Sequence, residues 1–195
     1  RRVNQAIHAL DPTENYLFFK PRLDDRYSST GIVSHNGQAL HAVPIHSSDE
    51  IATLISGNPD VSDKCIRLVA VDEIQFLDEG IIPLFLSLRQ QGIRVIATCL
   101  NQDFRGDPFC FRYSKRHVGD LFPYADVQTY KAICKYNLDG RLCKRPAEHT
   151  QRLFPDGQPV PYTDPLLVVG GTHVQHERKY EARCTEHHFV PGRPW

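Results

Sequence analysis

The chain has 195 residues, enough for one domain of ordinary size together with a small module. Its 23 lysines and arginines balance 23 aspartates and glutamates, which argues against a general nucleic-acid or membrane binder, because such proteins usually carry a basic excess. No apolar run in the sequence approaches the ~20 residues of a membrane span, and no secretory signal is visible.

Short apolar runs alternate with amphipathic segments through the first two thirds of the chain. Helices are predicted over residues 1–10, 49–56 and 81–91, the first stopped by Asp11-Pro12, the second capped by Ser47-Ser48-Asp49-Glu50 and the third ended by Gly92. Strands are predicted at residues 16–19, 42–45, 66–71 and 95–100, the last two as strands buried within the sheet. This alternation predicts an α/β fold, with a parallel sheet covered by helices on both faces.

The composition changes after about residue 128, where Pro, Gly, Thr and charged residues become more frequent and apolar runs shorten. We therefore expect a domain boundary there, with an α/β domain over residues 1–128 and a smaller domain over residues 129–195.

The predicted strand at residues 66–71 runs directly into two acids in LVAVDEIQF, residues 68–76. Ligands of parallel α/β sheets bind at the carboxyl ends of the strands, which is where Asp72 and Glu73 are expected. One carboxylate there suits Mg²⁺, directly or through water, and its neighbour suits removal of a proton from an attacking hydroxyl. The alternative is an acidic turn that faces solvent, and this stretch alone does not decide between the two.

Six cysteines are too widely spaced for the disulfide framework of a small secreted protein. Those at positions 65, 99 and 110 are expected to be ordinary thiols. Cys134 and Cys143 form a C-x8-C pair, and Cys184 and His187 form a C-x2-H pair. Two ligand pairs from separate segments are how a structural zinc ribbon is built, although ordinary thiols and a surface histidine remain the alternative, and His188 competes with His187.

Two further segments allow a functional and a structural interpretation. Aromatic and basic residues alternate between Phe109 and Arg116, as in a stacking and phosphate patch for nucleic acid, but at zero net charge a packed loop is favoured. The polar stretch GGTHVQHERKY, residues 170–180, is typical of a flexible surface loop.

Five stretches occur in an order that is specific in combination. They are FFKPRLDDRYSSTGIVSHNG (18–37), VDEIQF (71–76), LNQDFRGDPF (100–109), HTQRL (149–153) and YEARC (180–184). The series closely resembles the type II thymidine kinases, and the resemblance covers nearly the whole chain. VDEIQF alone would not be specific, since many P-loop ATPases end a strand in a similar way.

The resemblance implies a P-loop NTPase-like α/β domain and a small C-terminal zinc-binding domain, with a lasso loop over the nucleoside. It implies ATP-dependent phosphorylation of the 5′-hydroxyl of thymidine, deoxyuridine also being possible. It further implies Mg²⁺ with ATP, structural Zn²⁺, a cytoplasmic homotetramer and feedback by thymidine triphosphate, with neither nucleic acid nor membrane as a partner.

The resemblance also assigns roles to individual residues. Asp72 matches the Mg²⁺-associated acid and Glu73 the catalytic base. Residues near the phosphates and the metal match Gln75, Asp24, Asp25 and Arg26. Residues around the nucleoside match Phe76, Leu100, Phe104, Thr150, Leu166, Leu167, Val168, Val169, Gly170 and Tyr180. The zinc ligands match Cys134, Cys143, Cys184 and His187.

The sequence departs from the family pattern in one respect. The family has a Walker A loop, G-x-x-x-x-G-K-[ST], upstream of the segment that matches Arg1-Arg2-Val3, and residues 1–195 contain no such loop. Without it the ATP phosphates have no cradle, so the chain as it stands is expected to be inactive. Because both acids are kept and no methionine is present, we expect a trimmed or incompletely recorded chain rather than a natural pseudokinase. A fragment of a nucleic-acid-dependent P-loop ATPase is the competing hypothesis.

Overall fold

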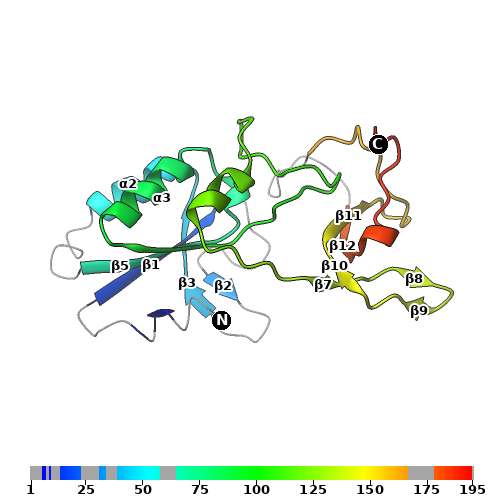
Figure 1. Ribbon diagram of the computed structural model, residues 1–195, viewed down its shortest axis with the longest axis horizontal. Coiled ribbons are helices and arrows are strands. Elements are labelled where there is room, and N and C mark those ends of the chain that lie inside the picture. Colours follow the sequence, from blue (N-terminus) through cyan, green and yellow to red (C-terminus); the bar gives the residue numbers. More distant parts are fainter. Residues whose placement is uncertain are drawn as a thin grey trace. The chain divides into compact units, whose positions relative to one another are not determined.

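A computed structural model describes residues 6–7, 9, 14–22, 31–33, 39–57, 65–166 and 178–194. The chain divides into two compact units (Figure 1). The first unit comprises residues 1–100, 110–124 and 168–170, and the second comprises residues 101–109, 125–167 and 171–195. Of the helix predicted over residues 1–10, Ala6, Ile7 and Ala9 are described; Ala6 and Ile7 are helical and Ala9 lies in a turn.

The first unit is built on a parallel sheet of four strands in the order β4-β1-β5-β6. These strands are β1 (Glu14–Pro21), β4 (Val43–Ile45), β5 (Cys65–Val71) and β6 (Arg94–Ala97). In the register of the sheet, Val71 lies between Phe19 of β1 and Ala97 of β6. The parallel sheet predicted from the sequence is thereby confirmed.

Burial within the sheet follows strand position. Between its two neighbours, β5 is almost wholly buried from Ile66 to Val71, apart from the exposed Arg67, as expected for a strand covered on both faces. The prediction of a buried strand over residues 95–100 is wrong: β6 ends at Ala97, its residues are half-buried or exposed, and residues 98–100 are exposed. Among the described strands β6 is the last in the order, so it has a neighbour on one side only.

Helices α2 (Ser48–Ser56) and α3 (Ile81–Gln90) lie over one face of the sheet (Figure 1). Helix α3 buries Ile81, Ile82, Phe85 and Leu88, a stripe at helical spacing. It ends where the sequence predicted, because Gly92 adopts a φ of 77° and the amides of Gly92 and Ile93 bond back to the carbonyls of Arg89 and Leu88, which is the Schellman arrangement.

The N-termini of α2 and α3 share one carboxylate. Ser47, predicted to cap α2, makes no side-chain cap. Instead Asp78 accepts hydrogen bonds from the backbone N–H of Ser48 at 2.8 Å, from the Ser48 hydroxyl at 2.6 Å and from the Gly80 N–H at 3.0 Å. Burial acts to raise the pKa of Asp78, but these bonds outweigh it and lower the pKa below its ordinary value. A carboxylate 30 residues away in sequence thus supplies the cap.

The remaining elements of the first unit are short. A hairpin is formed by β2 (Gly31–Val33) and β3 (Ala39–His41), and 3₁₀ helices are formed by η2 (Ile74–Phe76) and η3 (Val118–Tyr124).

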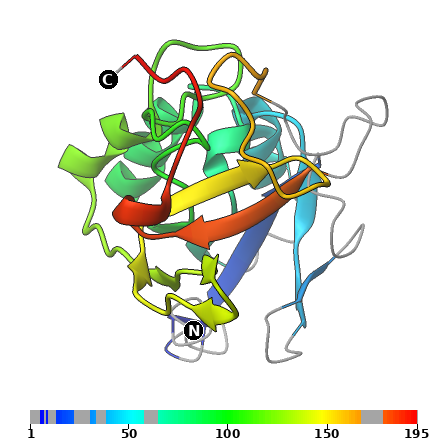
Figure 2. The same cartoon turned by 90° about the vertical axis from the view of Figure 1, so that its right-hand side faces the viewer.

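The second unit is made of short antiparallel pairs. Its strands are β7 (Ala132–Ile133) with β10 (Pro146–Ala147), β8 (Asn137–Leu138) with β9 (Arg141–Leu142), and β11 (His149–Leu153) with β12 (Lys179–Arg183). Figure 2 shows β11 in yellow beside β12 in orange-red. A 3₁₀ turn, η4 (Thr185–His187), follows β12. Across the described residues of both units, no helix has the length and apolar character needed to cross a bilayer.

We expect Asp78→Asn to lower the free energy of unfolding by about 1–3 kcal/mol, because an amide replaces a charged acceptor of three hydrogen bonds. The lowered pKa sets the pH dependence: the carboxylate's contribution is present above its unfolded-state pKa, about 3.9, and is lost as the pH falls through the folded-state value. Urea unfolding should therefore show a difference from wild type at pH 7 that shrinks in acid. Asp49→Asn, at an exposed acid in the first turn of α2, is the control and should cost less. Equal costs for the two variants would contradict the shared cap.

Candidate active site and metal centre

The carboxyl edge of the sheet carries both acids that the sequence singled out. Asp72 directly follows β5, and its N–H donates to the carbonyl of Phe19 on β1 at 3.0 Å. Glu73 comes next and is held on the other side, where its N–H donates to the Thr98 hydroxyl at 3.1 Å. Both side chains are partly exposed, so a ligand at this edge has access to two carboxylates.

The backbone turns sharply at Glu73, which adopts a left-handed conformation with φ 47° and ψ 48°. That region is uncommon for a residue with a side chain, and strain of this kind is concentrated at functional sites. The turn ends the strand and begins η2, which buries Ile74, Gln75 and Phe76. Glu73 therefore leaves the line of β5 at the position where a catalytic carboxylate was expected.

The buried side chain of Gln75 orients the Glu73 carboxylate through a hydrogen bond. It is 1% exposed, its Nε2 amide donates to Glu73 Oε2, and its Oε1 accepts from the Leu100 N–H at 3.2 Å. One buried amide thus connects the carboxylate to the chain that follows β6. The sequence placed Gln75 with the phosphates and the metal. Among the described residues, the Gln75 side chain bonds to Glu73 and to the backbone of Leu100, so the geometry shows a contact that orients Glu73.

Thr98 is a residue of this edge that the sequence did not single out. It follows β6, and its hydroxyl donates to Asp72 Oδ1 while accepting from the Glu73 N–H. The neighbouring Cys99 is also close to this site: although the residue is exposed, desolvation of the thiol by nearby groups first, and the charge of Glu73 second, raise its pKa.

The other residues predicted for the first unit are placed only in part. Phe76 is buried at 7% exposure, whereas Leu100 is 43% exposed. Asp24, Asp25 and Arg26 lie outside the described residues, which end at Arg22 after β1. Because β1 is parallel to β5 and adjacent to it, the chain that leads to these three residues departs from the same edge as Asp72.

In the second unit, the aromatic rings of Phe104 and Tyr180 both lie close to the guanidinium of Arg152. Arg152 of β11 is 1% exposed, and its Cζ atom lies 5.0 Å from the centre of the Phe104 ring and 5.9 Å from that of Tyr180. Phe104 is buried and Tyr180 half-exposed. Thr150, also predicted for the nucleoside, is on the same strand two residues from Arg152 and pairs with Ala182 of β12. Three of the predicted nucleoside residues are therefore gathered around one strand pair.

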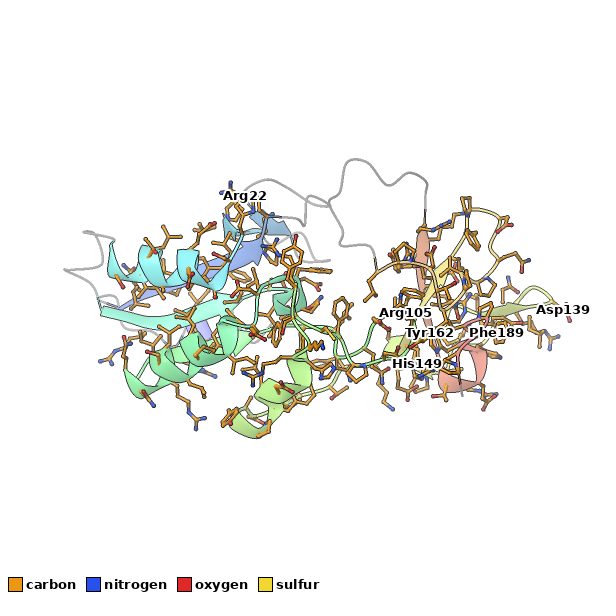
Figure 3. The ribbon with its side chains drawn as sticks, turned by 90° about the horizontal axis from the view of Figure 1, so that it is seen from above. Arg22, Arg105, Asp139, His149, Tyr162 and Phe189 are labelled. Carbon is orange, nitrogen blue, oxygen red and sulfur yellow. The ribbon has the colours of Figure 1, made fainter. Side chains whose placement is uncertain are left out.

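Arg152 also ties this group to the segment that leads into the predicted lasso. Its guanidinium donates to the Pro165 carbonyl at 2.7 Å and pairs with Asp164 at 3.1 Å. Arg105 donates to the Asp164 carbonyl at 2.7 Å and lies 5.2 Å from the Tyr162 ring (Figure 3). Leu166 follows and is 44% exposed, and residues 167–170, which hold the rest of the predicted lasso contacts, lie outside the described residues.

The loop that carries Phe104 is shaped by a buried acid. Asp103 Oδ1 accepts from the backbone N–H groups of Arg105 at 2.8 Å and Asp107 at 3.2 Å. Burial raises the pKa of Asp103 despite these bonds. Tyr162 closes the loop through a 2.7 Å hydrogen bond from its hydroxyl to Asp107. Phe104 is thus presented by a loop fixed at both ends.

Cys134, Cys143, Cys184 and His187 converge, with their ligand atoms all within 4.8 Å of one another. The Cys143 and Cys184 sulfurs are 3.9 Å apart, and His187 Nδ1 lies 3.7 Å from Cys134 Sγ and 3.4 Å from Cys184 Sγ. A tetrahedral Zn²⁺ with bonds of ~2.3 Å to sulfur separates its sulfurs by about 3.8 Å. The four side chains therefore fit a structural zinc ion without rearrangement of the backbone.

The geometry favours His187 over His188 as the fourth ligand. The His187 ring stacks on Tyr136, with centroids 4.1 Å apart, which holds Nδ1 toward the sulfurs. The adjacent His188 faces elsewhere: its Nε2 lies 2.9 Å from the carbonyl of Phe104, and its ring stacks on His149 with centroids 4.5 Å apart. Consecutive histidines thus point to the metal cluster and to the Phe104 loop.

The eight residues between Cys134 and Cys143 form a β-hairpin. Strands β8 and β9 are joined by Asp139 and Gly140, both with positive φ, 49° and 82°, as in a type I′ turn. The hairpin extends away from β7 and β10 (Figure 1), with Asp139 at its tip (Figure 3). The C-x8-C spacing therefore accommodates an ordered hairpin and leaves both sulfurs at the cluster.

The pKa values of two thiols of the cluster shift in opposite directions: desolvation, and then the hydrogen bond with Cys134, raise the pKa of Cys184. Burial acts to raise the pKa of Cys134, but hydrogen bonds with the backbones of Cys184 and Tyr136, and with the His187 side chain, lower it to about 6. Thiolate, not thiol, is the form of cysteine that binds a metal. Arg145 adds a positive charge beside the thiolates and pairs with Glu186 of η4.

Comparison with known families gives one finding that bears on all of these residues. The family model described as "Thymidine kinase" matches residues 3–188. The match includes the acidic sheet edge, the Phe104 loop, the β11–β12 pair and the cysteine–histidine cluster. It confirms the resemblance seen in the five sequence stretches and extends over almost the entire chain, and the protein therefore belongs to the thymidine kinase family.

Proposed function

We propose that the protein phosphorylates the 5′-hydroxyl of thymidine with ATP as the donor, as a kinase of nucleotide salvage. The observation that carries the proposal is the pair of carboxylates at the end of β5, one bonded to Thr98 and the other to Gln75. Family membership supports a thymidine kinase in general. The division of labour between Asp72 and Glu73 rests on the geometry of the turn and on the resemblance.

Glu73 is proposed as the general base. Its carboxylate accepts the proton of the 5′-hydroxyl while that oxygen attacks the γ-phosphorus of ATP, and ADP leaves. The left-handed turn and the Gln75 amide fix the carboxylate before substrate binds. Such preorganisation contributes to catalysis because little reorganisation remains at the moment of transfer.

Asp72 is proposed as the acid that holds Mg²⁺. Its oxygens suit a hard cation, and Thr98 fixes the orientation of its carboxylate. When bound, Mg²⁺ neutralises charge on the phosphates of ATP. Asp24, Asp25, Arg26 and Gln75 are proposed to complete the phosphate side.

The nucleoside is proposed to contact Phe76, Leu100, Phe104, Thr150, Leu166, Leu167, Val168, Val169, Gly170 and Tyr180. The hydrogen bonds to the base are proposed to come from the backbone of residues 166–170, because few side chains of that stretch donate or accept and Gly170 allows a close approach. Phe104 and Tyr180, both against Arg152, supply shape and packing. The zinc ion, the cytoplasmic homotetramer and feedback by thymidine triphosphate are proposed from the resemblance.

Glu73→Gln should lower kcat by roughly 10²–10⁴-fold, because the amide keeps the shape and loses the proton acceptor. The measurement is the steady-state rate of a protein that carries a Walker A loop ahead of Arg1, together with the thymidine Kd by calorimetry, which should hardly change. The matched control is Glu79→Gln, at an exposed acid that bonds to Ser114, and it should keep wild-type turnover. Near-normal turnover of Glu73→Gln would remove Glu73 from the mechanism.

The cysteine–histidine cluster should hold about one Zn²⁺ per chain in tetrahedral coordination. Cys184→Ser should lower the zinc content measured by mass spectrometry. It should also weaken thymidine binding, because η4 and His188 connect the cluster to the Phe104 carbonyl. Cys110→Ser, at a thiol outside the cluster, should retain both zinc and affinity. Wild-type protein that contains no zinc, prepared without chelator, would refute the site.

Phe104→Ala should weaken thymidine binding by roughly tenfold, through lost packing against the base. It should not admit deoxycytidine, since the polar pattern of the pocket is assigned to the backbone, and a buried mismatch of donor and acceptor costs about 1–3 kcal/mol. Leu166→Ala, a truncation at an exposed position, should have a smaller effect. Competition assays with both nucleosides measure the outcome. A Phe104→Ala enzyme that phosphorylates deoxycytidine would show that side chains carry the specificity.

A further inference from the structure

We propose that Thr98 is a positioning residue for both acids, whose hydroxyl holds the Asp72 carboxylate and the Glu73 backbone in the arrangement needed for phosphoryl transfer. The inference rests on the proposed function and deepens it. It assigns a role in the reaction to a side chain on the neighbouring strand, which the stretch around the acids does not reveal.

The backbone of Thr98 is fixed on both sides of the acidic turn. Its N–H donates to the Val71 carbonyl at 3.0 Å, and its carbonyl accepts from the Ile74 N–H at 3.1 Å. Val71 precedes the two acids and Ile74 follows them. Thr98 therefore spans the turn as a continuation of the β5–β6 pairing, and its side chain cannot shift along the edge without breaking these bonds.

The hydroxyl then makes one bond to each acid. It donates to Asp72 Oδ1 and accepts from the Glu73 N–H at 3.1 Å. A hydroxyl has one donor and two acceptor positions, so its donor and one acceptor are used on the two residues proposed for catalysis. The other carboxylate oxygen of Asp72, Oδ2, is the one that we expect to face the cation.

The bond to the Glu73 N–H has a separate consequence. Glu73 has positive φ, and in that conformation its N–H leaves the regular ladder of the sheet. The Thr98 hydroxyl supplies the acceptor at that point. Loss of the hydroxyl would release one side of the turn that aims the Glu73 carboxylate, while Gln75 would still hold the carboxylate itself.

Threonine suits this position for a chemical reason. Its hydroxyl is on a β-branched carbon, which restricts the side chain to few rotamers, so the oxygen is held where both bonds form. Serine keeps the hydroxyl with more rotational freedom, and valine keeps the branched shape without the hydroxyl. These two substitutions therefore separate the hydrogen bonds from the packing.

The test compares Thr98→Val, Thr98→Ser and the unsubstituted sequence, each in a protein that carries a Walker A loop ahead of Arg1. Groups that orient a metal ligand typically contribute 10–100-fold to metal affinity or activity. Thr98→Val should therefore lower kcat by roughly that factor. It should also weaken Mn²⁺ binding, which is measured by electron paramagnetic resonance in the presence of ADP. Thymidine Kd, measured by calorimetry without metal or ATP, should stay within about twofold, because the hydroxyl contacts the acids and not the base. Thr98→Ser should recover most of both kcat and Mn²⁺ affinity.

The control is Thr53→Val, which removes an exposed threonine hydroxyl bonded to a helix carbonyl, and it should leave all three measurements unchanged. Unchanged kcat and Mn²⁺ binding in Thr98→Val would overturn the proposal. The proposal would also be overturned if kcat and thymidine affinity fell by the same factor, the melting temperature fell as well, and Thr98→Ser restored none of the three. That outcome would indicate a purely structural role. A wild-type protein that does not phosphorylate thymidine would reject the proposed function and this inference together, an outcome distinct from both.

Discussion

The register between β1, β5 and β6 is the constraint on which the acidic edge depends. Val71 is paired with Phe19 on one side and Ala97 on the other, so the residues that follow each strand emerge at one level. Asp72 bonds to the carbonyl of Phe19, and Thr98 reaches the residues on both sides of the turn. A slip of one residue would turn the side chains of β5 to the opposite faces. Burial of the apolar residues of β5 fixes this register, and it therefore also determines where Asp72 and Glu73 lie.

The second unit depends on two connections rather than on a sheet. A buried guanidinium, that of Arg152, lies against Phe104 and Tyr180, forms an ion pair with Asp164 and donates a hydrogen bond to the Pro165 carbonyl. A cluster of three thiols and one imidazole joins the hairpin region to η4, and the next residue, His188, bonds to the Phe104 loop. With few apolar residues to bury in its short strands, the unit relies on such polar contacts. A buried charge such as the Arg152 guanidinium is costly unless its partners are in place. The Phe104 loop is therefore sensitive to changes in the Arg152 contacts and in the cysteine–histidine cluster.

Much of the site was accessible from sequence because its signals are local. The continuous apolar run of β5 ending on two acids predicted both the strand and the position of the carboxylates, and the cysteine spacing predicted the side chains that converge in the cysteine–histidine cluster. The half-exposed state of β6 was not accessible, because burial of a strand depends on how many neighbours it acquires. The Asp78 cap was missed for the same reason, since its partner Ser48 is 30 residues away. The hairpin between Cys134 and Cys143 did have a local signal, the Asp139-Gly140 pair between Leu138 and Arg141, which predicts a type I′ turn.

The residues that orient the functional groups are the part of the candidate site that is hardest to identify from residue type alone. Thr98 has no charge and lies in none of the five stretches, and Gln75 is a neutral residue of VDEIQF, yet each bonds to a proposed catalytic acid. Tyr136 does the same for the imidazole of the metal cluster, through stacking at 4.1 Å, and Arg152 for the aromatic rings of the Phe104 group. Thr98, Tyr136 and Arg152 each lie on a different segment from the group they orient, so the pairing of elements reveals them, whereas Gln75 is only two residues from Glu73. The chemistry of the acids and thiols is set by residue type, whereas the precision that makes such chemistry effective is set by these neighbours. Substitution of the neighbours is therefore the more informative way to separate geometry from chemistry in this protein.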